Sequence, residues 1–350
     1  MKTIKVGVVG IGSIAHIFHL PNYKAHPQVE LTAVADTDLA RARRVAEEAG
    51  GIRAYGSAED MFASETLDAV SICTFNESHV PLALLALEHG LDVLVEKPMA
   101  MTVEQSAMLK ERAARGGNIV MVGMSHRFRP DAQALQGIVS SGQLGGVYFA
   151  KTRILRRRGV PEGWFTSKRY SGGGPMMDIG VHALDLAWWM MGRPEPEQVM
   201  GRLFREVAPY GTKGVSAYKA KSAENKERPI YDVEDMGAAF ITFANGAVLT
   251  LEASWAINGK QDDAIKVELY GTQGGATLDP LALYTESNGI LVESGMTVGK
   301  YDFYKSEIEH FVECVSERRQ PLVDAAQGHE VMRMLEAIRL SSETGESVRC

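Results

Sequence analysis

The sequence predicts an α/β protein with two domains. The first is expected to contain a doubly wound parallel sheet, and the second to be an α+β domain with an open, mostly antiparallel sheet. Strands and helices alternate from Ile4 to about Gly123, and a glycine-rich turn follows the first strand. Hairpin signals, Asn245-Gly246 and Asn288-Gly289, appear only later in the chain. These three observations together predict the change from a parallel to an antiparallel sheet.

The length of 350 residues exceeds one ordinary domain, so we place domains at 1–124 and 125–350. Strands of the first domain are expected at Ile4–Val9, Val29–Ala35, Ala69–Cys73, Asp92–Val95 and Ile119–Val122, with a helix over Leu39–Ala49. The second domain is expected to contain a helix at Asp131–Ser140, strands at Val147–Ile154, Asp235–Phe243 and Ala247–Trp255, and closing helices at Phe303–Arg318 and Ala325–Thr344. A polar stretch from Tyr210 to Arg228 is expected to be an exposed excursion.

The glycine-rich turn runs from Gly10 to Ala15, directly after the first strand, and opens a helix. Gly10 permits the tight turn, and Gly12 lets the backbone approach a pyrophosphate. Ala15 keeps the helix close to the strand. Amide donors at the start of the helix, including those of Ser13 and Ile14, would then meet the phosphate charge. The pattern predicts a dinucleotide-binding domain of the Rossmann type.

Asp36 ends the second strand, about twenty residues beyond the glycines, as this fingerprint requires. Its carboxylate is expected to accept hydrogen bonds from the adenosine ribose and to repel a 2′-phosphate, which favours NAD over NADP. Arg41, Arg43 and Arg44 follow closely. We interpret them as the solvated face of a helix; the alternative is that one arginine folds back and accommodates the phosphate.

Lys97 lies in Val95-Glu96-Lys97-Pro98, at the end of an apolar strand. Ligands of doubly wound sheets collect outside the carboxyl ends of the strands, so a cation there is expected to lie near the reacting groups. Pro98 fixes the backbone direction behind it. An isolated lysine is more often a solvated surface charge, but the neighbouring motifs favour a site.

The segment Gly172–His182 begins with three glycines followed by Pro175, and it is expected to be a flexible turn that feeds a helix ending near Gly192. Asp178 and His182 are four residues apart and therefore share one helix face. The alternative is that Asp178 complements the helix dipole while His182 is a core histidine. The glycines favour the functional interpretation, because they usually mark a place where something approaches closely.

These motifs, in this order and at this spacing, resemble the Gfo/Idh/MocA family over nearly the whole chain. The resemblance implies an NAD-dependent oxidoreductase with Lys97, Asp178 and His182 as the catalytic and substrate-binding set. The loop from Thr74 to His79 is similar to the family's cofactor loop, with Phe75 where a proline commonly stands. The expected cofactor-binding residues are Gly10, Gly12, Ser13, Ile14, Asp36, Thr74, Asn76, His79, Glu96 and Lys97.

The chemistry that uses these parts is the oxidation of a secondary alcohol. His182 is the natural base, because an imidazole titrates near neutral pH whereas a lysine stays protonated. Lys97 is expected to stabilise the developing alkoxide and to keep His182 neutral. Asp178 would orient the imidazole or a neighbouring substrate hydroxyl.

The substrate implied by the resemblance is a sugar, an inositol or a related polyol. Trp164 could stack on a pyranose face, and Arg127, Arg156 or Arg158 could bind hydroxyls or a carboxylate. The alternative is packing for Trp164 and solvation for the arginines. Nothing in the sequence selects one sugar.

Three other functions are compatible with these motifs. A nucleotide sensor would need only the glycine turn and Asp36, so the presence of Lys97, Asp178 and His182 weighs against it. A glycosidase that oxidises its substrate transiently would share every motif. The third alternative is the reduction of an unrelated carbonyl, as in bilin reductases of similar fold.

Composition sets further expectations. The net charge of −7 gives no electrostatic reason to expect binding to nucleic acid or an anionic membrane. Cys73, Cys314 and Cys350 have no paired spacing, which predicts neither disulfides nor a metal site and favours a reducing, cytoplasmic compartment. The apolar stretch after Lys2 and Lys5 is part of the glycine fingerprint, so no cleaved signal peptide is expected. Alternation in Ala238–Phe243 and Val248–Trp255 suggests an apolar outer sheet face, buried in a homodimer or homotetramer.

Overall fold

The computed structural model describes residues 3–212, 230–260, 262–300 and 302–350. Within these limits, the chain divides into two compact units. The first contains residues up to Ser125 and a later segment, Asp302–Met332; the second contains the remainder, from His126 onward. The polar stretch expected to form an excursion lies outside the described residues from position 213 onward.

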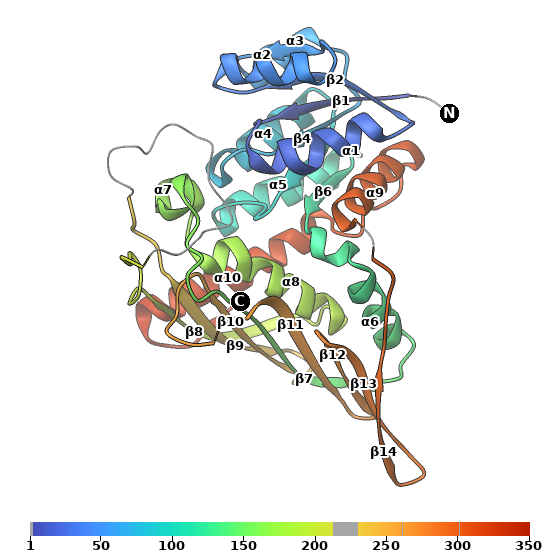
Figure 1. The fold of residues 1–350 in the computed structure, drawn as a ribbon, viewed down its shortest axis with the longest axis vertical. Helices are drawn as coiled ribbons and strands as arrows, with labels where there is room; N and C mark the ends of the chain where they lie inside the picture. The colour runs from blue at the N-terminus through green and yellow to red at the C-terminus, as the bar shows by residue number, and fades with distance from the viewer. Residues whose placement is uncertain (1–2, 213–229, 261, 301) are drawn as a thin grey trace. The chain divides into compact units, whose positions relative to one another are not determined.

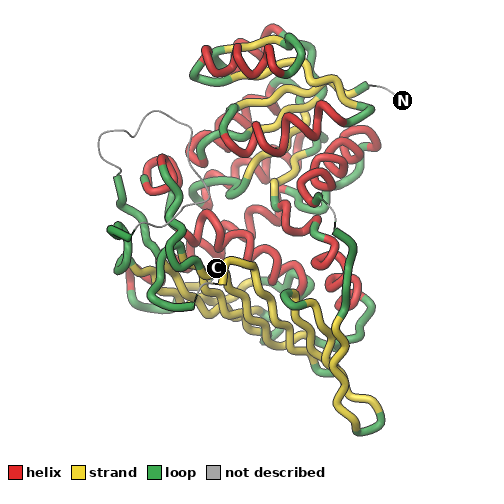
Figure 2. The backbone as a smooth tube through the Cα atoms, in the orientation of Figure 1, coloured by secondary structure: helices red, strands yellow, loops and turns green. Residues whose placement is uncertain are grey.

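The sheet of the first unit has six parallel strands in the order β3-β2-β1-β4-β5-β6, which confirms the doubly wound Rossmann sheet (Figures 1 and 2). The strands are β1 (Ile4–Val9), β2 (Val29–Ala35), β3 (Arg53–Tyr55), β4 (Ala69–Ile72), β5 (Asp92–Glu96) and β6 (Val120–Gly123). β3 was not expected, because three half-exposed residues carry too little apolar alternation to be recognised. The order change between β1 and β4 is where such sheets bind nucleotides.

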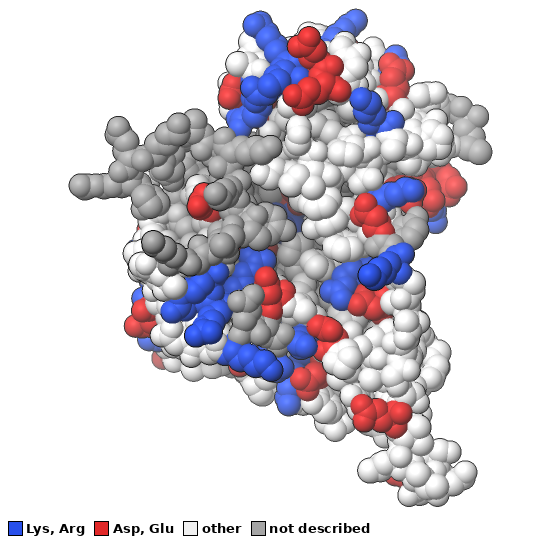
Figure 3. Space-filling model, viewed as in Figure 1, with Lys and Arg blue, Asp and Glu red and all other residues white. Residues whose placement is uncertain are grey.

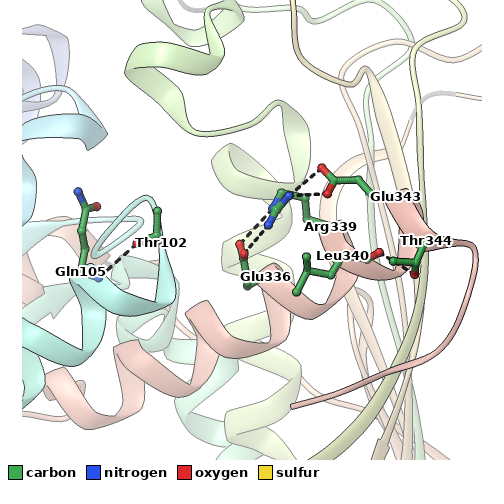
Figure 4. Close-up of polar contacts among 7 residues, drawn as sticks. All are labelled: Thr102, Gln105, Glu336, Arg339, Leu340, Glu343 and Thr344. Atoms are coloured by element: carbon green, nitrogen blue, oxygen red, sulfur yellow. Dashed lines mark hydrogen bonds and ion pairs between the residues drawn. The ribbon is translucent and has the colours of Figure 1, made fainter.

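The helices of this unit are η1 (Ala15–His19), α1 (Leu20–Ala25), α2 (Leu39–Glu48), α3 (Ala58–Ser64), α4 (Asn76–Glu88), α5 (Val103–Gly116) and α9 (Phe303–Glu317). Local chemistry sets their ends. Thr102 caps α5 by accepting the Gln105 N–H at 3.3 Å (Figure 4), and Gly117 ends the helix with a φ of 66°. α9 was assigned to the second domain from its position in the sequence. In the structure it packs in the first unit against α1 and η1, where Tyr304 stacks on Phe18.

The sheet of the second unit has nine strands in the order β14-β13-β12-β11-β7-β10-β9-β8-β15. Its pairs are antiparallel except β7 with β10, so the prediction of an open, mostly antiparallel sheet is confirmed. The strands are β7 (Val147–Leu155), β8 (Pro196–Phe204), β9 (Met236–Phe243), β10 (Val248–Ser254), β11 (Asp262–Gly271), β12 (Gly274–Leu278), β13 (Leu281–Ser287), β14 (Ile290–Gly295) and β15 (Val348–Arg349). Asn288 and Gly289 both have positive φ, as the predicted two-residue hairpin requires.

Helices cover one face of this second sheet (Figure 1). The helical segments are η2 (Ser125–Phe128), α6 (Pro130–Ser140), η3 (Gly163–Thr166), α7 (Lys168–Ser171), η4 (Met176–Gly180), α8 (Val181–Met190) and α10 (Ala325–Thr344). The first residue of η2 and the α10 residues up to Met332 belong to the first unit. The apolar helix α8 packs on β7, β10 and β11. Part of α10 lies so close to β8 that a Cβ on Gly201 would meet Ile338 at 2.9 Å.

The surface carries charges of both signs. On the face shown in Figure 3, basic and acidic side chains are interspersed. On α10, Arg339 lies between Glu336 and Glu343, the latter at 2.7 Å, one turn to either side (Figure 4). In the described parts of the chain, no group of three or more His, Cys, Asp or Glu side chains could hold a metal ion, and no helix is long and apolar enough to cross a membrane.

Candidate active site

The glycine-rich turn has the geometry that the sequence predicts. Gly10 has a φ of 85°, and a Cβ there would lie 2.8 Å from the main chain of Cys73 at the end of β4. Its amide donates to the Ala35 carbonyl at 2.8 Å, which ties the turn to β2. A side chain at position 10 would therefore need both a strained backbone and a shift of β4.

Gly12 faces open space. A Cβ built there meets nothing within 4 Å, and Ser13 and Ile14 next to it are half-buried. The helix continues as a π turn, η1, a rare conformation that is often found at functional sites. Open space in front of a helix start is what a phosphate group needs, so the turn fits the pyrophosphate of a dinucleotide.

Asp36 is buried, and its carboxylate accepts hydrogen bonds from neighbouring groups of the protein. Oδ2 accepts the Ile11 N–H at 2.8 Å, while Oδ1 accepts the Asp38 N–H at 2.8 Å and the Arg41 guanidinium at 2.9 Å. An ionised carboxylate can accept about four hydrogen bonds. Three are used by these groups, so one acceptor position remains for a ribose hydroxyl.

Arg41 does not belong to the solvated face of α2, and the interpretation of all three arginines as solvated is wrong for this residue. Its side chain is 19% exposed and folds back onto Asp36. Of the three arginines, only Arg43 and Arg44 are exposed on the helix. A guanidinium beside Asp36 partly offsets the carboxylate charge that was expected to repel a 2′-phosphate.

The loop after β4 is held from inside by His79. This side chain is 1% exposed; its Nδ1 lies 2.8 Å from the Pro98 carbonyl oxygen and its Nε2 lies 3.1 Å from that of Thr74. Burial lowers the pKa of His79, and this effect is larger than that of the hydrogen bonds to the two carbonyls, which raise the pKa. His79 was expected to bind the cofactor. The structure instead makes it a link between the Thr74 loop and the Pro98 turn, and Asn76 is also buried.

Glu96 supports the Lys97 turn and is itself enclosed. Its Oε1 accepts from His19 Nε2 at 2.9 Å, and its Oε2 accepts the Lys97 amide at 3.2 Å. Burial would raise the pKa of Glu96, but the His19 hydrogen bond and the charges of His19, Lys97 and His79 together lower it. The expected contact of Glu96 with the cofactor is therefore replaced by a supporting role, while Lys97 remains half-exposed.

Sequence reasoning missed the partners of Glu96. The Nδ1 of His19 is hydrogen-bonded to Ser71 Oγ at 3.2 Å, and Ser71 Oγ is hydrogen-bonded to the Tyr23 hydroxyl at 2.6 Å. All three side chains are buried. Glu307 on α9 is also buried, and its Oε1 makes no hydrogen bond within the described chain. Burial, and then the charge of Glu96, raise its pKa well above the ordinary value. Polar residues at otherwise apolar positions were the available signal, because buried polar groups need partners.

Asp178 and His182, in the second unit, are half-buried within an otherwise buried segment. All the other residues in the run from Gly173 to Met190, which is described throughout, are buried. Asp178 lies on the π turn η4, so the helix expected there begins with a wider turn; a spacing of four residues is still close to one turn. The two side chains therefore share the open face of this segment.

The space beside the glycines before η4 is occupied by another part of the protein. A Cβ on Gly174 would collide with the Glu234 carbonyl oxygen, and Glu234 Oε1 accepts the Met176 N–H at 3.3 Å. Burial raises the pKa of Glu234, although the backbone hydrogen bonds oppose it. The glycines do mark a close approach, and the group that approaches is Glu234.

His126 is a second imidazole beside His182 in the second unit, and sequence reasoning missed it. Its ring packs edge-on against His182, with centroids 4.7 Å apart. The next residue, Arg127, holds η2 to α8 through two bonds to Asp185, at 2.8 and 2.6 Å, and lies over the Trp189 ring. Arg127 was expected to contact substrate. This is wrong, because its side chain is 0% exposed and its charge is paired inside the core.

The remaining substrate candidates contact other side chains and carbonyls of the second unit. Arg156 donates to Asp263 at 2.6 Å and is 16% exposed. Arg158 binds the carbonyls of Arg157 and Ile257 and the side chain of Asn258, so it holds loops together. Trp164 is half-buried and stacks on Phe165, with centroids 4.1 Å apart.

Comparison with known proteins gives the same architecture. Residues 4–124 match the model of an oxidoreductase family with an NAD-binding Rossmann fold, and residues 132–277 match the GFO/IDH/MocA C-terminal domain. The D-glucoside 3-dehydrogenase of Escherichia coli (strain K12) is 34% identical over 348 residues, covering 99% of this chain and 97% of that protein.

Two more distant relatives extend the comparison. The scyllo-inositol 2-dehydrogenase (NAD(+)) of Bacillus subtilis (strain 168) is 25% identical over 327 residues, covering 91% of this chain and 88% of that protein. A structure of levoglucosan dehydrogenase in complex with NADH and L-sorbose matches with a TM-score of 0.86 at 22% identity, covering 100% of this chain and 99% of that one. This chain therefore belongs to the GFO/IDH/MocA family of NAD-binding oxidoreductases.

Proposed function

We propose that this protein oxidises a secondary hydroxyl group of a sugar or sugar glycoside, with Lys97, Asp178 and His182 as its catalytic residues. The substrate class rests on the relatives, which include a D-glucoside 3-dehydrogenase and a scyllo-inositol 2-dehydrogenase. A glycoside is favoured over a free inositol because the glucoside enzyme is the more similar, at 34% against 25% identity.

The observation that carries the catalytic assignment is the exposure pattern of η4 and α8. Through the buried run from Gly173 to Met190, only the carboxylate and the imidazole side chains remain accessible. A polar pair on an apolar helix is costly unless something uses it. An acceptor and a base on one helix face suit a hydroxyl group that must be held and deprotonated.

Each residue has a distinct role in this proposal. His182 accepts the hydroxyl proton, Asp178 orients the imidazole or an adjacent hydroxyl, and the Lys97 ammonium stabilises the negative charge on the substrate oxygen. Glu96 and His79 are positioning residues, because they hold the Lys97–Pro98 turn without facing outward. His126 supports the ring of His182 from its edge.

Bound NAD would supply the acceptor for the hydride of the substrate carbon. The groups that would hold it are the open turn at Gly12, the helix start at Ser13 and Ile14, and the remaining acceptor position of Asp36. Thr74, in the loop after β4, is half-buried and remains a candidate for contact with the cofactor. The products are then a ketone, NADH and one proton.

The test is NADH formation with methyl α-D-glucopyranoside, myo-inositol and D-xylose. We expect turnover with the glucoside, and a loss of about 100-fold or more in His182→Ala and Lys97→Ala with the NAD dissociation constant unchanged, the usual scale for a lost general base or charge. His89→Ala and Lys24→Ala, at exposed positions, are the matched controls. Wild-type turnover in either active-site variant would contradict the roles.

Trp164 remains the proposed sugar platform. It is half-buried, and an aromatic ring can stack on the apolar face of a pyranose. Arg156 is a weaker candidate because Asp263 already binds it. Trp164→Ala should raise KM for the glucoside and leave NAD binding unchanged; an unchanged KM would remove Trp164 from the site.

Association of two copies through the outer face of the second sheet is also proposed. Met200 and Phe240 are paired across β8 and β9 on that face and are 49% and 47% exposed. The face is not uniformly apolar as expected, because exposed Lys151, Arg202 and Glu252 interrupt it. Light scattering should give a dimer or tetramer, and Phe240→Asp should weaken it; a wild-type monomer would contradict the proposal.

A further inference from the structure

We infer that Trp255 is a positioning residue for Asp178, acting through its indole N–H; this inference rests on the catalytic role proposed for Asp178. Trp255 follows β10 directly and is 0% exposed. Its Nε1 donates to Asp178 Oδ2 at 3.1 Å. An indole N–H is a donor only, so it can serve an acceptor oxygen and nothing else.

The backbone around this contact is held on both sides. The Trp255 amide donates to the Asp235 carbonyl at 2.9 Å, and the neighbouring Glu234 accepts the Met176 N–H at the start of η4. Gly180, at the end of η4, lies so close to β10 that a Cβ would meet Ala253 at 3.1 Å. Strand and π turn therefore form one packed unit, and the indole reaches Asp178 from a fixed origin.

The contact assigns different tasks to the two carboxylate oxygens. Oδ2 is held by the buried indole, which restricts rotation of the Asp178 side chain about its last torsion. That restriction orients Oδ1. A carboxylate that orients an imidazole or a hydroxyl acts through direction, so loss of this restraint should reduce turnover more than it reduces binding.

The chain offers a matched comparison in Trp188 on α8. This side chain is 3% exposed, and its Nε1 donates to the Pro194 carbonyl oxygen at 2.9 Å. The two tryptophans thus share burial and a satisfied N–H. They differ in the partner, which is a backbone carbonyl for Trp188 and a candidate catalytic carboxylate for Trp255. Replacing each by Phe removes the same donor and leaves most of the ring volume.

The experiment is a double-mutant cycle on NADH formation from methyl α-D-glucopyranoside. Trp255→Phe should lower kcat about tenfold with KM changed less than threefold, and should have no further effect in an Asp178→Ala background. Trp188→Phe should leave kcat within about twofold. A purely structural role would make the Trp255→Phe and Asp178→Ala effects multiply, and that result would overturn the inference.

An NMR measurement covers the case in which Trp255→Phe fails to fold. The chain has four tryptophans and so four indole N–H signals. In Asp178→Ala the signal of Trp255 should move and that of Trp188 should not; no movement would overturn the inference. Wild-type turnover in Asp178→Ala would instead contradict the proposed function, whereas an impaired Asp178→Ala with multiplying effects would remove only Trp255.

Discussion

The two glycine turns of this protein look alike in sequence and differ in what surrounds them. The turn at Gly10–Gly12 and the turn at Gly172–Gly174 each lead into a π turn, η1 and η4. A Cβ on Gly12 would meet nothing within 4 Å, whereas a Cβ on Gly174 would collide with the main chain of Glu234. The first turn is open and the second is filled.

This difference shows that a glycine-rich turn can serve either ligand binding or packing of the chain. An open turn leaves space that a ligand can occupy, so its glycine serves binding. A filled turn admits another part of the chain, so its glycine serves packing and only positions the residues that follow, here Asp178. The sequence alone indicates only that something approaches the glycines closely, and both a ligand and another part of the chain satisfy that expectation. The predictions below test the contrast.

The largest expected effect is on stability at the filled turn. Gly174→Ala should lower the free energy of unfolding by about 3 kcal/mol or more, because the Glu234 backbone cannot move as a side chain can. Gly173→Ala is the matched control, since its Cβ would meet the flexible Met177 side chain at 2.7 Å. Urea denaturation measures both. A Gly174→Ala variant within 1 kcal/mol of wild type would show that the turn yields.

The open turn should respond in binding and not in stability. Gly12→Ala should weaken NAD binding about ten- to a hundredfold, because the methyl group takes space that the pyrophosphate needs. Its free energy of unfolding should stay within about 1 kcal/mol of wild type. Calorimetric titration with NAD is the measurement, and unchanged affinity would mean that the phosphate lies elsewhere.

Buried glutamates extend the comparison to pH. Burial raises the pKa of both Glu307 and Glu234, but only Glu234 accepts backbone hydrogen bonds that oppose the shift. A raised carboxyl pKa in the folded state means that stability is fully present below about pH 4.5 and is lost as pH rises toward the folded value. Glu307→Gln should therefore gain stability over wild type with increasing pH.

Glu307→Gln is expected to gain stability over wild type as the pH rises from 5 to 8, with a smaller gain for Glu234→Gln, whose backbone hydrogen bonds oppose the rise in pKa. Denaturation curves across this range measure it. Glu88→Gln, at an exposed position, is the control and should change nothing. A difference between Glu307→Gln and wild type that does not vary with pH would show that Glu307 does not titrate differently on folding.

The smallest expected effect is a change in NADP affinity when Arg41, beside Asp36, is replaced. Arg41→Ala should weaken NADP binding about three- to tenfold and leave NAD binding within about twofold, because the guanidinium beside Asp36 can meet a 2′-phosphate. Asp36→Ser should shift preference the opposite way, toward NADP. Fluorescence titration with both nucleotides decides this. If the ratio of the two affinities stays constant in Arg41→Ala, the arginine only restrains Asp36.

Much of the fold could be predicted because its signals are local. Alternation of apolar strands with helices predicted five of the strands in the first sheet, and the Asn288-Gly289 pair predicted its hairpin through two positive φ angles. The exception, β3, is too short to carry a period. Likewise, the spacing of Asp178 and His182 predicted a shared face, since helix geometry alone decides it.

Partners distant in sequence could not be predicted. Arg127 and His79 are polar side chains in motifs, and the sequence offered no way to know that Asp185 and the Pro98 carbonyl would bind them. Their burial follows from packing of elements up to 58 residues apart.

By itself, the sequence determined where the backbone turns, which segments are strands or helices, and which residue types stand at the candidate site, because these depend on local sterics and periodicity. The tertiary structure alone decided that α9 joins the first unit, that Glu234 fills one glycine turn while the other stays open, and that Trp255 reaches Asp178. These contacts join residues many positions apart, and only the packed core brings them together.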